Sequence, residues 1–117
     1  MAHTARFQEI LRRLAVIDER LVDDSARLAV AESGIIDPKT AALVRMGALA
    51  AIGSPAVWLE WSTTRALAAG ATEDEITDVL LAIAPVIGLS RAVAAVPGVA
   101  KALGYDVEAA VLDPDGP

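Results

Sequence analysis

The chain has 117 residues and no cysteine, and its 16 acidic and 10 basic residues give a net charge of −6. The absence of cysteine excludes disulfides and thiol chemistry, and the acidic balance argues against nucleic-acid binding, which requires a basic surface. One domain with one core is expected for this length.

Alanine, leucine and valine dominate the composition, which favours close helix packing over a sheet. The hydrophobic fraction of 55% is more than a small domain can bury alone, so a homo-oligomer is expected. The longest apolar runs, around residues 48–52 and 79–89, fall short of the roughly 20 residues that cross a bilayer. The N-terminus does not resemble a signal peptide, so we expect a cytoplasmic protein without membrane association.

Apolar residues recur at helical spacing between about residues 5 and 31, which predicts a first helical region. Asp18, or Asp24 with Ser25, is expected to start a second helix within it, because these side chains favour caps. Gly34 is expected to end the region. The apolar residues are Phe7, Ile10, Leu11, Leu14, Ile17, Leu21 and Leu28.

Asp37 and Pro38 predict the start of the next helix, because the aspartate can accept from a free backbone N–H and proline fits the first turn. From residue 43 to 52 this helix is apolar nearly all round apart from Arg45, so we expect it to be buried on most sides, in the domain or at a subunit contact. Gly53 is expected to end it.

Ser54 and Pro55 repeat this opening chemistry. They predict a helix from Pro55 to about Ala69, which Gly70 ends in the left-handed conformation.

Thr72 and Glu75 predict a capping box at the start of a further helix. One side of this helix is an apolar stripe, and Pro85 is expected to kink or end it. The stripe comprises Ile76, Val79, Leu80, Ile83 and Ile87.

Shorter helices are expected in the rest of the chain. One spans about residues 90–96 and is broken by Pro97 and Gly98. A second ends at Gly104, and Asp106 caps a last turn that runs through Leu112.

No segment alternates convincingly as a strand. Residues 1–112 are therefore predicted to form a single all-α domain, and residues 113–117 a loose polar tail.

Several short motifs occur in an order and spacing that resemble the carboxymuconolactone decarboxylase family, which shares the alkylhydroperoxidase D-like fold. The resemblance covers about residues 36–89 and implies an alkylhydroperoxidase D-like helical bundle whose subunits form trimers or hexamers. It also implies a site beside the central helices, near a subunit boundary. The motifs are residues 36–40 (IDPKT), 41–45 (AALVR), 59–61 (LEW), 66–72 (ALAAGAT), 75–76 (EI), 84–85 (AP) and Gly88.

The chain departs from this family at the residues that carry its redox chemistry. Redox members have two cysteines and a histidine, whose positions fall here at Pro55, Trp58 and Ser62. Decarboxylase members usually have a histidine near Ser62, whereas the single histidine of this chain is His3. A cysteine-dependent peroxidase is therefore excluded.

Trp58 and Trp61 lie one helical turn apart and point roughly the same way. They pack in the core or in an interface, or they form the apolar wall of a small-molecule pocket.

Arg45 interrupts an apolar helix, and Arg45 or Arg65 would hold a carboxylate. A structural salt bridge is the alternative for Arg45.

Glu60 and Ser62 are the candidates for proton transfer. An ion-paired or solvated carboxylate is the alternative for Glu60, and a hydroxyl bonded within its own helix is the alternative for Ser62.

Two functions remain open. The first is a protein that binds, and in its enzymatic form transforms, a small apolar or carboxylated organic molecule by a lyase-like activity, with neither cofactor nor metal. The second is a non-catalytic oligomeric structural protein that retains the fold.

Overall fold

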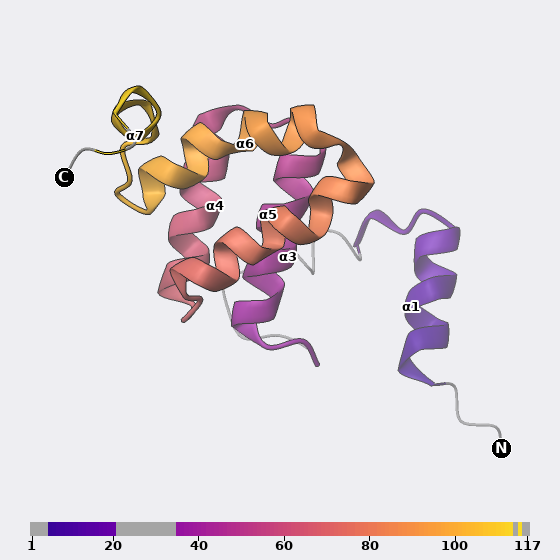
Figure 1. Ribbon diagram of the computed structural model, residues 1–117. Coiled ribbons are helices and arrows are strands. Elements are labelled where there is room, and N and C mark those ends of the chain that lie inside the picture. Colours follow the sequence, from indigo (N-terminus) through magenta and orange to yellow (C-terminus); the bar gives the residue numbers. More distant parts are fainter. Residues whose placement is uncertain (1–4, 21–34, 114, 116–117) are drawn as a thin grey trace, which may run out of the picture. The chain divides into compact units, whose positions relative to one another are not determined.

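The computed structural model describes residues 5–20, 35–113 and 115 (Figure 1). The chain divides into two compact units, residues 1–35 and 36–117. All regular secondary structure in the described residues is helical, which confirms the predicted all-α class for them. Within the same ranges, no helix has the length and apolar character that crossing a bilayer requires.

The first unit contains α1 (Arg6–Ala15), which ends in a tight turn. The N–H of Asp18 donates to the carbonyl of Arg13 at 2.9 Å and that of Ile17 to the carbonyl of Leu14 at 3.1 Å, the pattern of a Schellman motif. Ile17 has φ +57°, a left-handed conformation that is unfavourable for a β-branched residue.

The Asp18 carboxylate accepts from the backbone N–H of Arg20 at 3.1 Å, and helical structure resumes at residue 19. The predicted restart at Asp18 is therefore confirmed. The alternative restart at Asp24 and Ser25, and the expected end at Gly34, lie outside the described residues.

The described part of the second unit consists of α3 (Pro38–Ala51), α4 (Ala56–Ala68), α5 (Glu73–Ile87), α6 (Leu89–Ala102) and α7 (Val107–Leu112). α4 packs against α3 and α6, and α5 also contacts α3 and α6. The α5–α6 pair lies across α3 and α4 (Figure 1).

Most of the predicted helix ends are confirmed. The Asp37 carboxylate accepts from the N–H of Thr40 at 2.7 Å. Gly53, Gly70 and Gly104 follow the ends of α3, α4 and α6 with φ of +73°, +100° and +73°, which glycine adopts without steric penalty. Asp106 caps α7 by accepting from Ala109.

The capping box of α5 also joins two helices. Thr72 N–H donates to Oε1 of Glu75 at 2.9 Å, and Glu75 N–H donates to Oγ1 of Thr72 at 3.1 Å. The second oxygen of Glu75, Oε2, lies 2.9 Å from Nζ of Lys39 in the first turn of α3. One carboxylate therefore holds the beginning of α5 and ties it to the beginning of α3.

The expected cap at Ser54 is wrong. Pro55 is itself the N-cap of α4, in an extended conformation with ψ 152°, and no side chain caps this end. The Pro55 carbonyl accepts from the N–H groups of Trp58 and Leu59 at 3.0 and 3.4 Å. Because Pro55 is extended, the helix starts at Ala56, one residue later than expected.

The break expected at Pro97 and Gly98 is also wrong, because α6 continues through both residues. A Cβ atom on Gly98 would lie 2.5 Å from the carbonyl oxygen of Ala56 and 2.9 Å from Cβ of Leu59. The missing side chain therefore allows α6 to lie directly on α4, and this packing outweighs the helix bond lost at Pro97. Pro85 lies inside α5, which ends two residues later at Ile87, so the expected end of the helix near Pro85 is confirmed.

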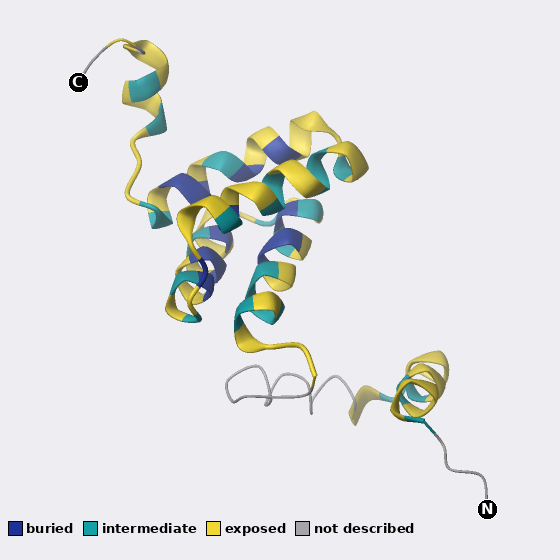
Figure 2. Cartoon of the chain, turned by 60° about the horizontal axis from the view of Figure 1, so that its bottom comes forward, coloured by how far each residue is buried: buried dark blue, intermediate teal, exposed yellow. Residues whose placement is uncertain are grey.

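Small side chains make up most of the buried interior of the second unit. Its buried positions are drawn in dark blue in Figure 2. The largest fully buried side chains are those of Met46, Leu59, Ile76 and Thr63. The α5 stripe faces this interior as predicted: Ile76 is buried, and its other members are partly buried. Within one chain, α3 buries Met46, Gly47 and Ala50, and its opposite side is exposed. The domain alone therefore does not bury α3 on most sides, and burial at a subunit contact stays a prediction.

Candidate functional site

The outward side of α4 carries an aromatic pair with a cation beside it. The rings of Trp58 and Trp61 meet edge to face, with centroids 6.0 Å apart and an interplanar angle of 85°. The guanidinium carbon of Arg65 lies 5.0 Å from the centroid of the Trp61 ring, within the range of a cation–π interaction. We call these three residues the aromatic face of α4.

Helical spacing explains why these side chains lie together, because positions three and four apart share one side of a helix. The opposite side of α4 is buried and includes Leu59, Ser62, Thr63 and Ala66. Trp58 is 54% exposed and Trp61 is 52% exposed, so the tryptophans do not belong to the core of this chain. Of the three alternatives for the two tryptophans, an interface and a pocket wall stay predictions.

Ser62 is buried on α4 and follows Trp58 by one helical turn. Its hydroxyl donates to the carbonyl of Leu59 at 3.2 Å. This is the geometry of a hydroxyl satisfied within its own helix.

Glu60 is partly buried, and its Oε2 lies 3.6 Å from Nζ of Lys101 on α6. The ion pair connects α4 to α6. The sequence suggests either proton transfer or an ion-paired or solvated carboxylate for Glu60, and the structure contains an ion pair.

Arg45 is exposed on α3. Among the residues that the structure describes, it forms neither a hydrogen bond nor an ion pair. Its guanidinium is therefore available for an anion.

Thr63 was not predicted as a notable residue. It is fully buried, and its hydroxyl has no hydrogen-bond partner in the described structure. The spacing of Leu59, Ser62, Thr63 and Ala66 along α4 contains the signal for its burial, because these positions form one helical side.

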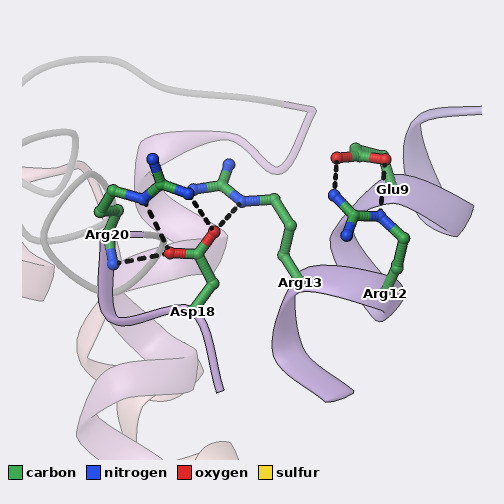
Figure 3. Close-up of polar contacts among 5 residues, drawn as sticks. All are labelled: Glu9, Arg12, Arg13, Asp18 and Arg20. Carbon is green, nitrogen blue, oxygen red and sulfur yellow. Dashed lines mark hydrogen bonds and ion pairs between the residues drawn. The ribbon is translucent and has the colours of Figure 1, made fainter. Parts of the chain in front are cut away.

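A charge cluster in the first unit was also not predicted (Figure 3). Oδ2 of Asp18 accepts from Nε of Arg13 at 3.0 Å and from Arg20 at 3.2 Å, and Oδ1 accepts from Nε of Arg20 at 3.1 Å. Hydrogen bonds from Arg20 first and Arg13 second lower the pKa of Asp18 to about 2. These hydrogen bonds stabilise the turn after α1.

No group of three or more potential metal ligands occurs in the parts of the chain that the structure describes.

Comparison with protein families gives a match over residues 20–101, more than half of the chain, to the family described as "Carboxymuconolactone decarboxylase family". The same comparisons find no matching curated protein and no matching solved structure.

Proposed function

Since the chain belongs to the carboxymuconolactone decarboxylase family and has no cysteine, we propose that it forms a homo-oligomer that binds a small organic carboxylate without thiol redox chemistry and without a cofactor. The binding surface is the aromatic face of α4. The observation that carries the proposal is the Trp58–Trp61 pair, half exposed, with Arg65 stacked on it.

The three side chains complement a flat organic acid. The two indole rings offer apolar surface at right angles to each other, suited to a ring or an unsaturated chain. The guanidinium of Arg65 is oriented by the ring beneath it, so less side-chain freedom is lost when it binds a carboxylate through two hydrogen bonds. Arg45 is the second candidate for this anion.

Homo-oligomerisation, as a trimer or hexamer, is part of the proposal. An exposed site of this kind binds weakly, because water competes for both the guanidinium and the carboxylate. A second copy covering the aromatic face would exclude water and strengthen the charge interaction. The abundance of exposed apolar side chains on the second unit, residues 36–117, supports such an assembly.

Lyase-like turnover is the second step of the proposal, with Glu60 or Ser62 moving a proton. The Ser62 hydroxyl is bonded to Leu59, and the Glu60 carboxylate is paired with Lys101. Because both groups already have partners, the arrangement supports ligand binding more directly than turnover. Catalysis would require Glu60 to exchange Lys101 for the ligand.

The rival function is a structural oligomer in which the aromatic face packs against another copy. The half-exposed tryptophans fit this arrangement as well. The two functions differ in whether a small acid reaches Trp58 and Trp61 in the assembled protein.

Tryptophan fluorescence tests the proposal, because Trp58 and Trp61 are the only tryptophans of the chain. Carboxymuconolactone, the compound in the family's name, and benzoate serve as probes, and methyl benzoate serves as the uncharged control. We expect the acids to change the emission saturably and the ester to bind at least tenfold more weakly. Arg65→Gln should remove this preference, whereas Lys101→Gln, outside the aromatic face, should retain it.

Equal effects of acid and ester, or acid binding that persists in both Arg65→Gln and Arg45→Gln, would contradict the carboxylate site. Release of CO2 from carboxymuconolactone tests turnover separately. Loss of this release in Glu60→Gln or Ser62→Ala, with binding retained, would assign the proton transfer.

A further inference from the structure

The turn that follows α1 holds an isoleucine in a backbone conformation that usually belongs to glycine. Ile17 has φ +57°, and it is the one non-glycine residue of the described chain with a positive φ. The other positive values there belong to Gly53, Gly70, Gly88 and Gly104. For a β-branched residue this conformation is an outlier, which persists only where neighbouring contacts hold it. The contacts around Ile17 therefore decide whether the turn is kept.

The local sequence does not require a break at this point. Neither glycine nor proline occurs in residues 1–33. The helical spacing of the apolar residues also runs through the turn, because Phe7, Leu14 and Ile17 would share one side of a continuous helix. In the structure the Ile17 side chain is 82% exposed. The pattern thus favours one helix through residue 17, whereas the structure contains a bend.

A charge cluster holds the bend, and a continuous helix cannot form it (Figure 3). Oδ2 of Asp18 accepts from Nε of Arg13 at 3.0 Å, and Oδ1 accepts from Nε of Arg20 at 3.1 Å. Positions five apart or two apart point to different sides of an α-helix, unlike positions three or four apart. The Asp18 carboxylate can therefore bond both guanidinium groups only while the chain is bent.

Arg13 has a second carboxylate within reach on its own helix. Glu9 precedes it by four residues, the spacing of a favourable helical ion pair. A hydrogen bond from Arg12, and then the charges of Arg12 and Arg13, lower the pKa of Glu9. Arg13 can consequently give up Asp18 and still interact with a carboxylate, which reduces the cost of straightening the chain.

We propose that residues 16–18 are a two-state hinge. In the bent state, which the structure contains, the Asp18 cluster holds Ile17 in the left-handed conformation. In the straight state residues 6–20 form one helix, and Ile17 extends the apolar side that begins at Phe7. The hinge belongs to the first unit, so it goes beyond the ligand site proposed on α4.

The charge cluster makes the hinge sensitive to ionic strength. The Arg20 side chain is 84% exposed, so dissolved ions reach its contact with Asp18 and weaken it. The strain at Ile17 does not depend on salt. Salt therefore shifts the first unit toward the straight state, in which it presents a longer apolar side.

Amide hydrogen exchange of the full-length protein tests the hinge, with the Glu19 N–H as the reporter. In the bent state helical structure resumes at Glu19, and the first N–H groups of a helix have no acceptor within it. In the straight state this N–H donates to the Ala15 carbonyl. Asp18→Ala should slow its exchange about fivefold or more, and about 1 M sodium chloride should slow it in the wild type.

The matched control is Glu9→Gln, which removes a carboxylate of α1 that does not hold the turn. It should leave the exchange of the Glu19 N–H at the wild-type rate. Ile17→Gly combined with Asp18→Ala should return this rate toward that of the wild type, because glycine adopts the left-handed turn without strain.

A nuclear Overhauser contact between Hα of Val16 and the N–H of Glu19 gives a second readout, because a helix brings these atoms together. We expect it in Asp18→Ala and not in the wild type at low salt. Unchanged or faster exchange of the Glu19 N–H in Asp18→Ala would overturn the hinge. Slow exchange that persists after Ile17→Gly is added would also overturn it. Ligand binding at the tryptophans is measured separately, so the two proposals can fail independently.

Discussion

A Cβ atom placed on Gly98 of α6 would lie 2.5 Å from the carbonyl oxygen of Ala56 on α4. Real Cβ atoms do not approach a backbone oxygen so closely, so one helix would have to move. Overpacking of this kind costs roughly 1–3 kcal/mol. This exceeds the ~0.5–1 kcal/mol that alanine gains over glycine inside a helix.

We therefore expect Gly98→Ala to lower the free energy of unfolding, measured from the urea midpoint. Ala94→Gly, at an exposed position of the same helix, serves as the control for helix propensity alone and should cost ~1 kcal/mol. A Gly98→Ala variant as stable as the wild type would show that α4 and α6 are not in close contact.

Thr63→Val should stabilise the protein by about 1 kcal/mol, because it replaces a buried hydroxyl without a partner by a methyl group of the same shape. Thr64→Val is the matched control. Its hydroxyl is exposed and donates to the carbonyl of Glu60 at 2.9 Å, so the change should stay within about 0.5 kcal/mol of neutral. Thermal or urea unfolding measures both. Destabilisation by Thr63→Val would indicate that the hydroxyl has a partner after all.

Stability should fall as the pH is lowered below about 4.5. The ion pair with Lys39, and then the N–H of Thr72, hold the pKa of Glu75 below its ordinary value of 4.5. The backbone N–H of Thr40 similarly lowers the pKa of Asp37 from 3.8. Because the folded pKa values are the lower ones, the unfolded chain takes up protons first, and the stabilisation is lost as the pH falls through the folded values.

The melting temperature between pH 7 and pH 2 measures this effect. Glu75→Gln keeps an oxygen for the capping box and removes the charge next to Lys39. It should be less stable than the wild type at pH 7, and the two curves should converge at low pH. A constant difference across this range would mean that the ion pair does not contribute.

Ile17→Gly should stabilise the turn after α1 by about 1 kcal/mol, because glycine adopts φ +57° without the penalty that isoleucine has there. The readout is hydrogen exchange of the Asp18 amide, which donates to the Arg13 carbonyl. Its exchange should slow about fivefold. Ile17→Ala, which is also disfavoured in this conformation, should leave the rate near that of the wild type. Faster exchange in the glycine variant would contradict the left-handed turn.

The features that the sequence predicted correctly are local ones. The caps at Asp37 and Thr72, and the glycines after α3 and α4, act within a few residues, so short motifs are sufficient to identify them. The continuation of α6 through Pro97 depends on a neighbouring helix that is distant in sequence, and local propensity points the other way.

In the candidate site, too, short motifs predict some features, and others depend on packing between distant helices. The shared side of Trp58, Trp61 and Arg65 follows from helical spacing alone. Their exposure depends on which side of α4 the other helices cover. The pairing of Glu60 with Lys101 depends on the packing of α4 against α6, which no local pattern contains.

Alanine accounts for six of the ten buried apolar residues in the described structure. A buried alanine loses no rotamer freedom and sets the distance between two backbones directly. A larger side chain at one of these positions therefore meets no flexible side chain that it could displace. A whole helix has to move instead. Sequence variation compatible with this fold should consequently concentrate on outward positions, where new ligand specificities and new subunit contacts can arise while the spacing of the helices stays fixed.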